Sequence, residues 1–186
     1  MNITIRQENE KDYEESERVV ERAFKNAEYT DHNEHLLVAR LRKSDAFVPE
    51  LSLVAELDGE IVGHIMLTKL IIENEESNYD SLALAPVSVV PEHQNKGIGS
   101  KLISESLKIA KEIGFKSVIV LGHDKYYPRF GFKPASTWGI KAPFDVPDKF
   151  FMALELEDGN LEDISGTVVY SKEFSELYYR YVPAYR

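Results

Sequence analysis

Hydrophobic and polar positions follow different periods along the chain, and each period predicts one kind of secondary structure. In the first half, short apolar or alternating runs predict four strands, at 3–5, 51–57, 61–72 and 82–90. Asp58-Gly59 separates two of these runs and predicts a tight hairpin between them. Apolar residues three or four positions apart predict helices over 10–27 and from about 31 to 42, with Asp31 as the N-cap of the second helix.

The period changes near residue 97. A helix is predicted over 97–113, ended by Gly114, and a short buried strand over 117–121. The apolar face of this helix is predicted to consist of Leu102, Ile103, Leu107, Ala110 and Ile113. Residues 82–121 therefore form a strand–helix–strand unit, whose strands are expected to be parallel with a right-handed crossover.

The remainder of the chain mixes short elements with turns. A helical turn at 126–130 precedes a stretch at 134–147 that reads as a loop, and strands are predicted at 150–156 and 166–170, separated by a turn at Asp158-Gly159. The predicted fold is a mixed α/β (α+β) sheet, with antiparallel hairpins first, one parallel unit afterwards and helices on both faces. We expect a single domain over 1–186, with a core at 1–133 and an extension at 134–186 packed on the same domain.

Composition narrows the class of function. The chain has 186 residues, a formal net charge of -10 and no cysteine. The missing cysteines exclude disulfides, a thiolate metal site and a cysteine nucleophile. The negative charge argues against a nucleic-acid partner, and no apolar run is long enough for a membrane span. The N-terminal residues show no signal-peptide h-region, so a cytoplasmic location is expected. The charge first serves solubility, although it would also favour a cationic substrate.

One segment carries most of the chemical information. It runs from a strand through Gln94-Asn95-Lys96-Gly97-Ile98-Gly99-Ser100 into a helix, and first-turn helix amides together with the helix dipole form a phosphate site. A Walker A loop does not fit, because Gly99 is followed by Ser100 rather than lysine. A Rossmann loop does not fit either, because Leu102 replaces the third glycine and about four strands precede the loop. The pattern Gln/Arg-x-x-Gly-x-Gly/Ala fits fully.

With this pattern the sequence resembles the GNAT (GCN5-related N-acetyltransferase) superfamily. The resemblance covers about residues 1–133 in element order and is sharpest at 85–102 and at Tyr127-Pro128-Arg129-Phe130-Gly131-Phe132. The whole chain is also similar to the bacterial YhbS-like group, including the extension around 150–170. The fold that the resemblance implies is the GNAT, or acyl-CoA N-acyltransferase, fold.

The resemblance also implies a mode of cofactor binding. The pyrophosphate of coenzyme A would lie on the main-chain amides of Gln94, Asn95, Lys96, Gly97, Ile98, Gly99 and Ser100. The pantetheine arm would pair with Val87, Ser88 and Val89, and a backbone N–H near Val89 would polarise the acetyl carbonyl. The thioester would sit where this strand and the strand ending at Leu121 splay apart. Lys96 or Lys101 would add a cation at the rim.

Acetyl transfer to an amine requires an acid for the leaving thiolate and a base for the ammonium. Tyr127 is the predicted acid, because it occupies the tyrosine of the family pattern Tyr-x-x-x-Gly-Phe; the alternative is a half-buried core tyrosine. The base is left open among His123, Glu34 and His64, with His123 preferred, and a water chain could replace it. His32 and His35 lack the companions of a metal site, so no metal is expected.

The sequence therefore predicts an N-acetyltransferase that moves acetyl from acetyl-CoA to a primary amine by direct attack in a ternary complex. The acceptor is expected to be a small molecule, or a peptide amine. The alternative is a non-catalytic acyl-CoA-binding or sensor domain on the same fold. Aromatic residues are concentrated after residue 137 and are predicted to form a core, with a homodimer interface or an acceptor pocket wall as alternatives.

Overall fold

The structure is a computed structural model that describes residues 2–28 and 30–175. The described residues form two compact units, one within 1–68 and 85–109 and the other within 69–84 and 110–186. The prediction that 134–186 packs on the same domain as 1–133 stays a prediction.

The first unit contains an antiparallel set of strands. Strand β1 (Ile3–Gln7) pairs with β2 (Phe47–Leu57), and β2 pairs with the first part of β3 (Glu60–Glu73). The β2–β3 turn has φ values of 52° at Asp58 and 86° at Gly59. Positive φ at both central residues is what a two-residue hairpin of this twist requires. The predicted hairpin is confirmed.

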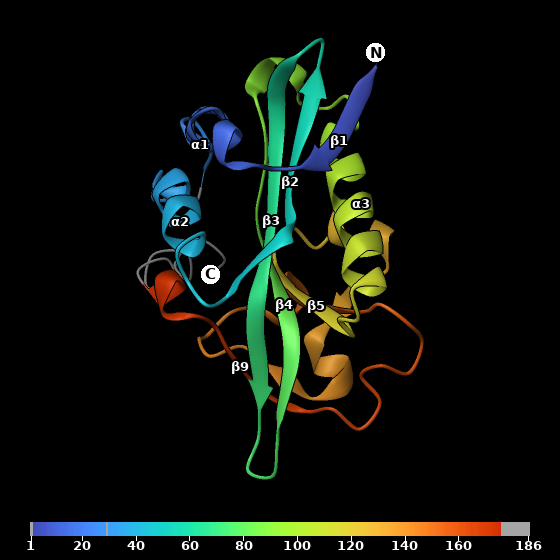
Figure 1. The fold of residues 1–186 in the computed structure, drawn as a ribbon. Coiled ribbons are helices and arrows are strands. Elements are labelled where there is room, and N and C mark those ends of the chain that lie inside the picture. Colours follow the sequence, from blue (N-terminus) through green and yellow to red (C-terminus); the bar gives the residue numbers. More distant parts are fainter. Residues whose placement is uncertain (1, 29, 176–186) are drawn as a thin grey trace. The chain divides into compact units, whose positions relative to one another are not determined.

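Helices lie on both sides of these strands (Figure 1). The short 3-10 helix η1 (Glu10–Asp12) leads into α1 (Tyr13–Phe24), and α2 (Glu34–Leu41) follows on the same side. Helix α3 (Ile98–Glu112) covers the other side. The predicted helices are thus confirmed, with somewhat shorter bounds.

The predicted start of α2 is wrong by two residues. Asn33 holds the N-cap position, and the Asp31 carboxylate instead accepts a hydrogen bond from the Asn33 amide at 3.0 Å. Asp31 therefore makes a local turn before the helix rather than its cap. The buried apolar face of α2 comprises Leu37, Val38 and Leu41, while Leu36 is 47% exposed.

The second unit contains the predicted parallel pair. Strand β4 (Asn78–Val89) pairs with β5 (Ser117–Leu121) in parallel, with Leu82 opposite Val118. Strand β8 (Phe151–Glu155) lies antiparallel on the other side of β5. Parallel and antiparallel pairs therefore occur together, as the sequence predicted.

The end of α3 is also as predicted, with one exception. Gly114 has φ 99°, its amide bonds Lys111 O at 3.1 Å, and the Phe115 amide bonds Ala110 O at 3.0 Å. These two bonds form a Schellman C-terminal motif. Ile113, which the periodicity placed on the buried face, is 44% exposed, because the chain leaves the helix at this point.

The stretch 134–147 is more ordered than a loop. It contains the 3-10 helix η4 (Ala135–Trp138) and strand β7 (Ile140–Lys141), and strand β6 (Lys133–Pro134) enters it. Strand β6 pairs with β8, and β7 pairs with β9 (Gly166–Val169), which also pairs with the end of β3. The loop prediction was wrong here because these elements are two to four residues long and carry no readable period. The other 3-10 helices described are η2 (Pro91–His93), η3 (Tyr127–Phe130), η5 (Asp148–Phe150) and η6 (Lys172–Phe174).

Aromatic side chains of the extension pack on one another within the second unit. Phe144 contacts Phe151 and Tyr170, with ring centroids 6.2 and 6.4 Å apart, and Tyr170 contacts Phe174 at 5.4 Å. These contacts accord with the predicted aromatic core. The predicted members Tyr178, Tyr179, Tyr181 and Tyr185 lie outside the described residues. A homodimer stays a prediction.

Candidate functional site

The segment between β4 and α3 leaves a run of main-chain donors unpaired. Within the described chain, the backbone N–H groups of residues 95–100 make no hydrogen bond, and the first helical bond runs from Lys101 N to Gly97 O at 3.1 Å. Only the Gln94 amide, just before the run, is bonded, to Pro91 O at 3.3 Å. Unpaired amides at the start of a 15-residue helix, reinforced by its dipole, form an anion site.

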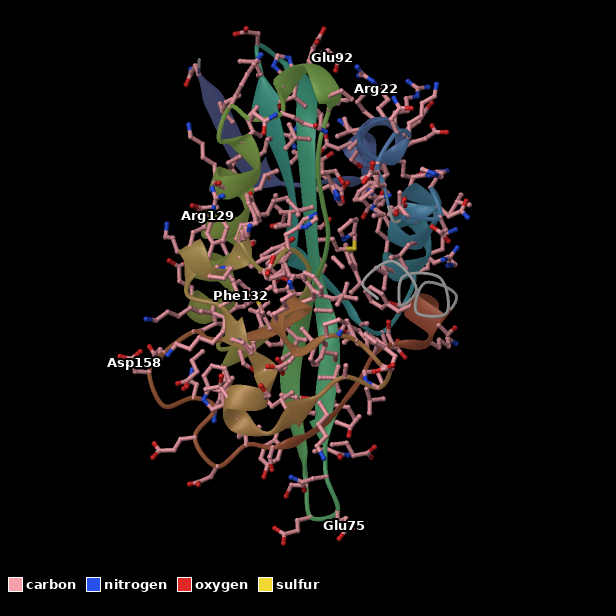
Figure 2. The ribbon with its side chains drawn as sticks, turned by 180° about the vertical axis from the view of Figure 1, so that it is seen from behind. Arg22, Glu75, Glu92, Arg129, Phe132 and Asp158 are labelled. Atoms are coloured by element: carbon pink, nitrogen blue, oxygen red, sulfur yellow. The ribbon has the colours of Figure 1, made fainter. Side chains whose placement is uncertain are left out.

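Side chains hold this loop in shape. Gln94 Nε2 donates to Val89 O at 2.9 Å, which ties the loop to the last residue of β4. Lys96 Nζ donates to Glu92 O at 2.8 Å, so this exposed lysine also braces the loop. Arg22 of α1 forms an ion pair with the Glu92 carboxylate at 2.7 Å, and Figure 2 shows the two labelled side chains next to each other.

Two residues of the loop have a left-handed backbone conformation. Gly97 has φ 82° and Asn95 has φ 59°, both in the left-handed region. Glycine adopts this region without cost and asparagine tolerates it better than most residues. The loop sequence therefore fits the backbone geometry that leaves the amides unpaired.

Gly63 is a residue that the sequence analysis did not single out. A β-carbon at this position would lie 3.0 Å from Leu102 Cδ1 and 3.1 Å from Ser88 O. Glycine in β3 thus lets α3 approach closely at its first turns. An isolated glycine inside a predicted strand was the only available signal.

The predicted pantetheine strand is the end of β4. Val87 and Val89 are partly exposed and Ser88 is 3% exposed. Ser88 Oγ makes no hydrogen bond within the described chain. The roles assigned to Val87, Ser88 and Val89 stay predictions.

Tyr127 begins η3 in the second unit and is 8% exposed. Its ring makes edge contacts with Tyr126 at 5.2 Å and Phe132 at 5.7 Å between centroids. Gly122 lies against the ring, since a β-carbon there would come within 2.2 Å of Tyr127 Cε2. The tyrosine is therefore fixed on three sides, which suits a positioned acid and a core residue alike.

The three candidate bases differ in environment. His123 is exposed, and its backbone oxygen accepts hydrogen bonds from the amides of Tyr126 and Tyr127 at 3.1 and 3.4 Å. Glu34 is 2% exposed and accepts a hydrogen bond from the Thr30 hydroxyl. His64 is fully buried. His123 is thus the only one of the three side chains that is solvent-accessible.

His64 belongs to a buried ionic cluster in the first unit. Glu8 accepts hydrogen bonds from Arg42 at 2.6 and 3.3 Å, from Ser52 at 2.5 Å and from Ser16, and His64 Nε2 lies 3.4 Å from its carboxylate. Burial by itself raises the pKa of Glu8, but the hydrogen bonds and charges of His64 and Arg42, with Ser16, hold that pKa well below its usual value. This cluster occupies His64 structurally, which weakens it as a candidate base.

Neither a metal site nor a membrane span is found in the described residues. His32 and His35 belong to no group of three or more side chains that could hold a metal ion. No helix in residues 2–28 and 30–175 is long and apolar enough to cross a membrane.

A glycine loop with unpaired amides after the fourth strand, followed by a helix and a strand parallel to the fourth, places the chain in the mixed α/β class. The family model described as "Acetyltransferase (GNAT) domain" matches residues 4–135. The chain belongs to the GNAT acetyltransferase family.

Relatives agree with this assignment. The chain is 40% identical over 114 residues to the uncharacterized N-acetyltransferase YjhQ of Escherichia coli K12, a match covering 61% of this chain and 63% of that relative. A GNAT family acetyltransferase of Brucella melitensis, solved in complex with acetyl-CoA, has 33% identity and a TM-score of 0.77, covering 94% of this chain and 99% of that one. YhbS of Escherichia coli, solved in complex with CoA, has 25% identity and a TM-score of 0.82 at 94% and 92% coverage.

Proposed function

We propose that the protein is an acetyl-CoA-dependent N-acetyltransferase that acts on a primary amine. The observation that carries the proposal is the run of unpaired main-chain donors at residues 95–100, which offers a diphosphate several hydrogen bonds without a single side chain. The cofactors named for the two solved relatives support the same cosubstrate.

Different residues would bind the cofactor and transfer the protons. Asn95 to Ser100 would hold the pyrophosphate through their main-chain amides, and Val87, Ser88 and Val89 would pair with the pantetheine arm. Gln94, whose own amide is bonded to Pro91 O, would instead tie the loop to β4. Bound acetyl-CoA would supply the activated acetyl group as a thioester. Tyr127 would donate a proton to the departing sulfur, because an unperturbed phenol stays protonated at neutral pH, with a pKa of about 10. His123, exposed at the start of the same turn, would accept the ammonium proton.

The residue types available support direct attack in a ternary complex. The chain has no cysteine to carry an acetyl group, and no Gly-x-Ser-x-Gly sequence. A non-catalytic acyl-CoA-binding domain remains the second candidate, because Tyr127 packs equally well as a core residue.

The first experiment measures binding. Isothermal calorimetry should show saturable CoA binding, and pantetheine, which lacks the pyrophosphate, should bind much more weakly. Equal affinity for the two compounds would contradict a role for the amides.

The second experiment separates the two candidates. A panel of amines is incubated with acetyl-CoA, and release of free thiol is followed. Turnover with at least one amine supports the transferase. Full CoA affinity with no acceptor-dependent thiol release would favour the binding domain.

A further inference from the structure

The extension contains a pocket of its own, within the second unit. Its volume is about 710 Å³, which falls in the usual range of roughly 300–1,000 Å³ for small-molecule sites. It lies between η4, the end of β8 and the segment that precedes β9. Its lining consists of Thr137, Trp138, Glu155, Gly159, Leu161, Glu162, Asp163, Ile164 and Ser165.

The charge of this lining has one sign. Glu155, Glu162 and Asp163 line the pocket and no lysine, arginine or histidine does. None of these carboxylates forms an ion pair with the described part of the chain, although Glu157 nearby pairs with Lys111 at 3.4 Å. The pocket therefore repels anions and attracts cations.

The rest of the lining is partly apolar and aromatic. The indole of Trp138 and the side chain of Ile164, both half-buried, form part of the wall, and Leu161 packs beneath them in the core. An indole face attracts ammonium groups more strongly than other aromatic side chains do, and it also packs against methylene groups. A ligand that combines separated positive charges with an aliphatic chain would match both halves of the lining.

A bare metal ion matches less well. The described residues include no group of three or more carboxylates or histidines placed to coordinate one ion. A hydrated ion would also leave the half-buried indole of Trp138 without a partner. The carboxylates are thus spread around the pocket rather than converged on one point.

We propose that this pocket binds an aliphatic diamine or polyamine, with its ammonium groups on the carboxylates and its methylene chain along Trp138. This site goes beyond the proposed transferase function, and binding there requires neither acetyl-CoA nor turnover. A protein that fails to transfer acetyl groups would still bind the cation, and the reverse also holds.

The sequence supplies a direct probe. Trp138 is the single tryptophan of the chain, so intrinsic tryptophan fluorescence reports on this pocket alone. Spermidine is titrated into the full-length protein in low-salt buffer near neutral pH, with 1,8-octanediol as an uncharged aliphatic control. We expect a saturable change in emission with spermidine and none with the diol. Added 0.5 M NaCl should weaken binding, because salt screens exposed charges.

Matched variants test the location. The double variant Glu162→Gln/Asp163→Asn should weaken spermidine binding about tenfold, from the loss of two exposed charge contacts. Asp158→Asn removes a charge from the same loop but lies outside the lining, and Figure 2 labels this residue. It should leave the affinity within about twofold. Thermal unfolding of each variant verifies that the fold is intact.

Calorimetry gives an independent readout that does not depend on fluorescence. Saturable binding lost in the double variant and kept in Asp158→Asn supports the site. No saturable binding by either method overturns the proposal. Equal weakening in the two variants also overturns it, because that result means general attraction of the cation to an acidic surface.

Discussion

Gly122 lies directly against the ring of Tyr127, so that a β-carbon at position 122 would stand 2.2 Å from Cε2 and 2.8 Å from Cδ2. Gly122→Ala should therefore displace the ring without changing its hydroxyl. Overpacking of this kind costs about 1–3 kcal/mol. We expect chemical denaturation to show a loss of that order and turnover to fall. An unchanged turnover number with an unchanged free energy of unfolding would mean that the ring moves freely.

Tyr127→Phe tests the hydroxyl itself. Removing a positioned general acid costs about 10²-fold or more in kcat, whereas the edge contacts of the ring with Tyr126 and Phe132 remain. The affinity for CoA, measured by calorimetry, should stay near that of the unmodified protein. A kcat that does not change, with chemistry shown to limit the rate, would remove Tyr127 from the acid role. Comparison with Gly122→Ala separates loss of the hydroxyl from loss of its position.

Gln94→Ala tests the tie between the loop and β4. The variant loses the bond from Gln94 Nε2 to Val89 O, so the free loop samples more conformations. We expect CoA affinity to fall about 3- to 10-fold, the range of one hydrogen bond. Gln7→Ala, in β1, is the matched control because its side-chain amide makes no hydrogen bond in the described chain. If Gln94→Ala and Gln7→Ala bind CoA with equal affinity, the hydrogen bond from Gln94 to Val89 does not contribute to CoA binding.

Local signals in the sequence predicted the elements that depend on local physics. Asp58-Gly59 needs two positive φ values, and Gly114 needs one, so residue type alone located both chain reversals. An amide run at 94–100 was predicted for the same reason, because a glycine loop before a helix leaves its first donors unpaired. The structure leaves 95–100 unpaired, whereas the Gln94 amide is bonded to Pro91 O.

Non-local features escaped prediction. Glu8 and Arg42 are 34 residues apart and form the centre of a buried cluster, yet each alone reads as a surface residue. The Trp138 pocket is lined by η4, the end of β8 and residues 159–165, segments whose contact depends on the tertiary fold and leaves no periodic signal in the sequence. Ile113 was misplaced because periodicity cannot detect where a helix turns away from the core.

The buried cluster predicts how stability depends on pH. The folded protein holds the pKa of Glu8 below its unfolded value of about 4.3. Its contribution is therefore fully present above that unfolded pKa and is lost as the pH falls toward the folded pKa. Glu8→Gln should lower the free energy of unfolding at pH 7 by about 1–3 kcal/mol, because Arg42 loses the charge of Glu8 but keeps its ion pair with Glu17. The fall of stability between about pH 5 and pH 3 should become less steep in this variant. Urea denaturation at several pH values measures both effects. Glu14→Gln removes an exposed carboxylate from α1. In this control the free energy of unfolding should fall with decreasing pH as it does in the unmodified protein. If the free energy of unfolding of Glu8→Gln falls between pH 5 and pH 3 as steeply as that of the unmodified protein, the acid sensitivity belongs to another group.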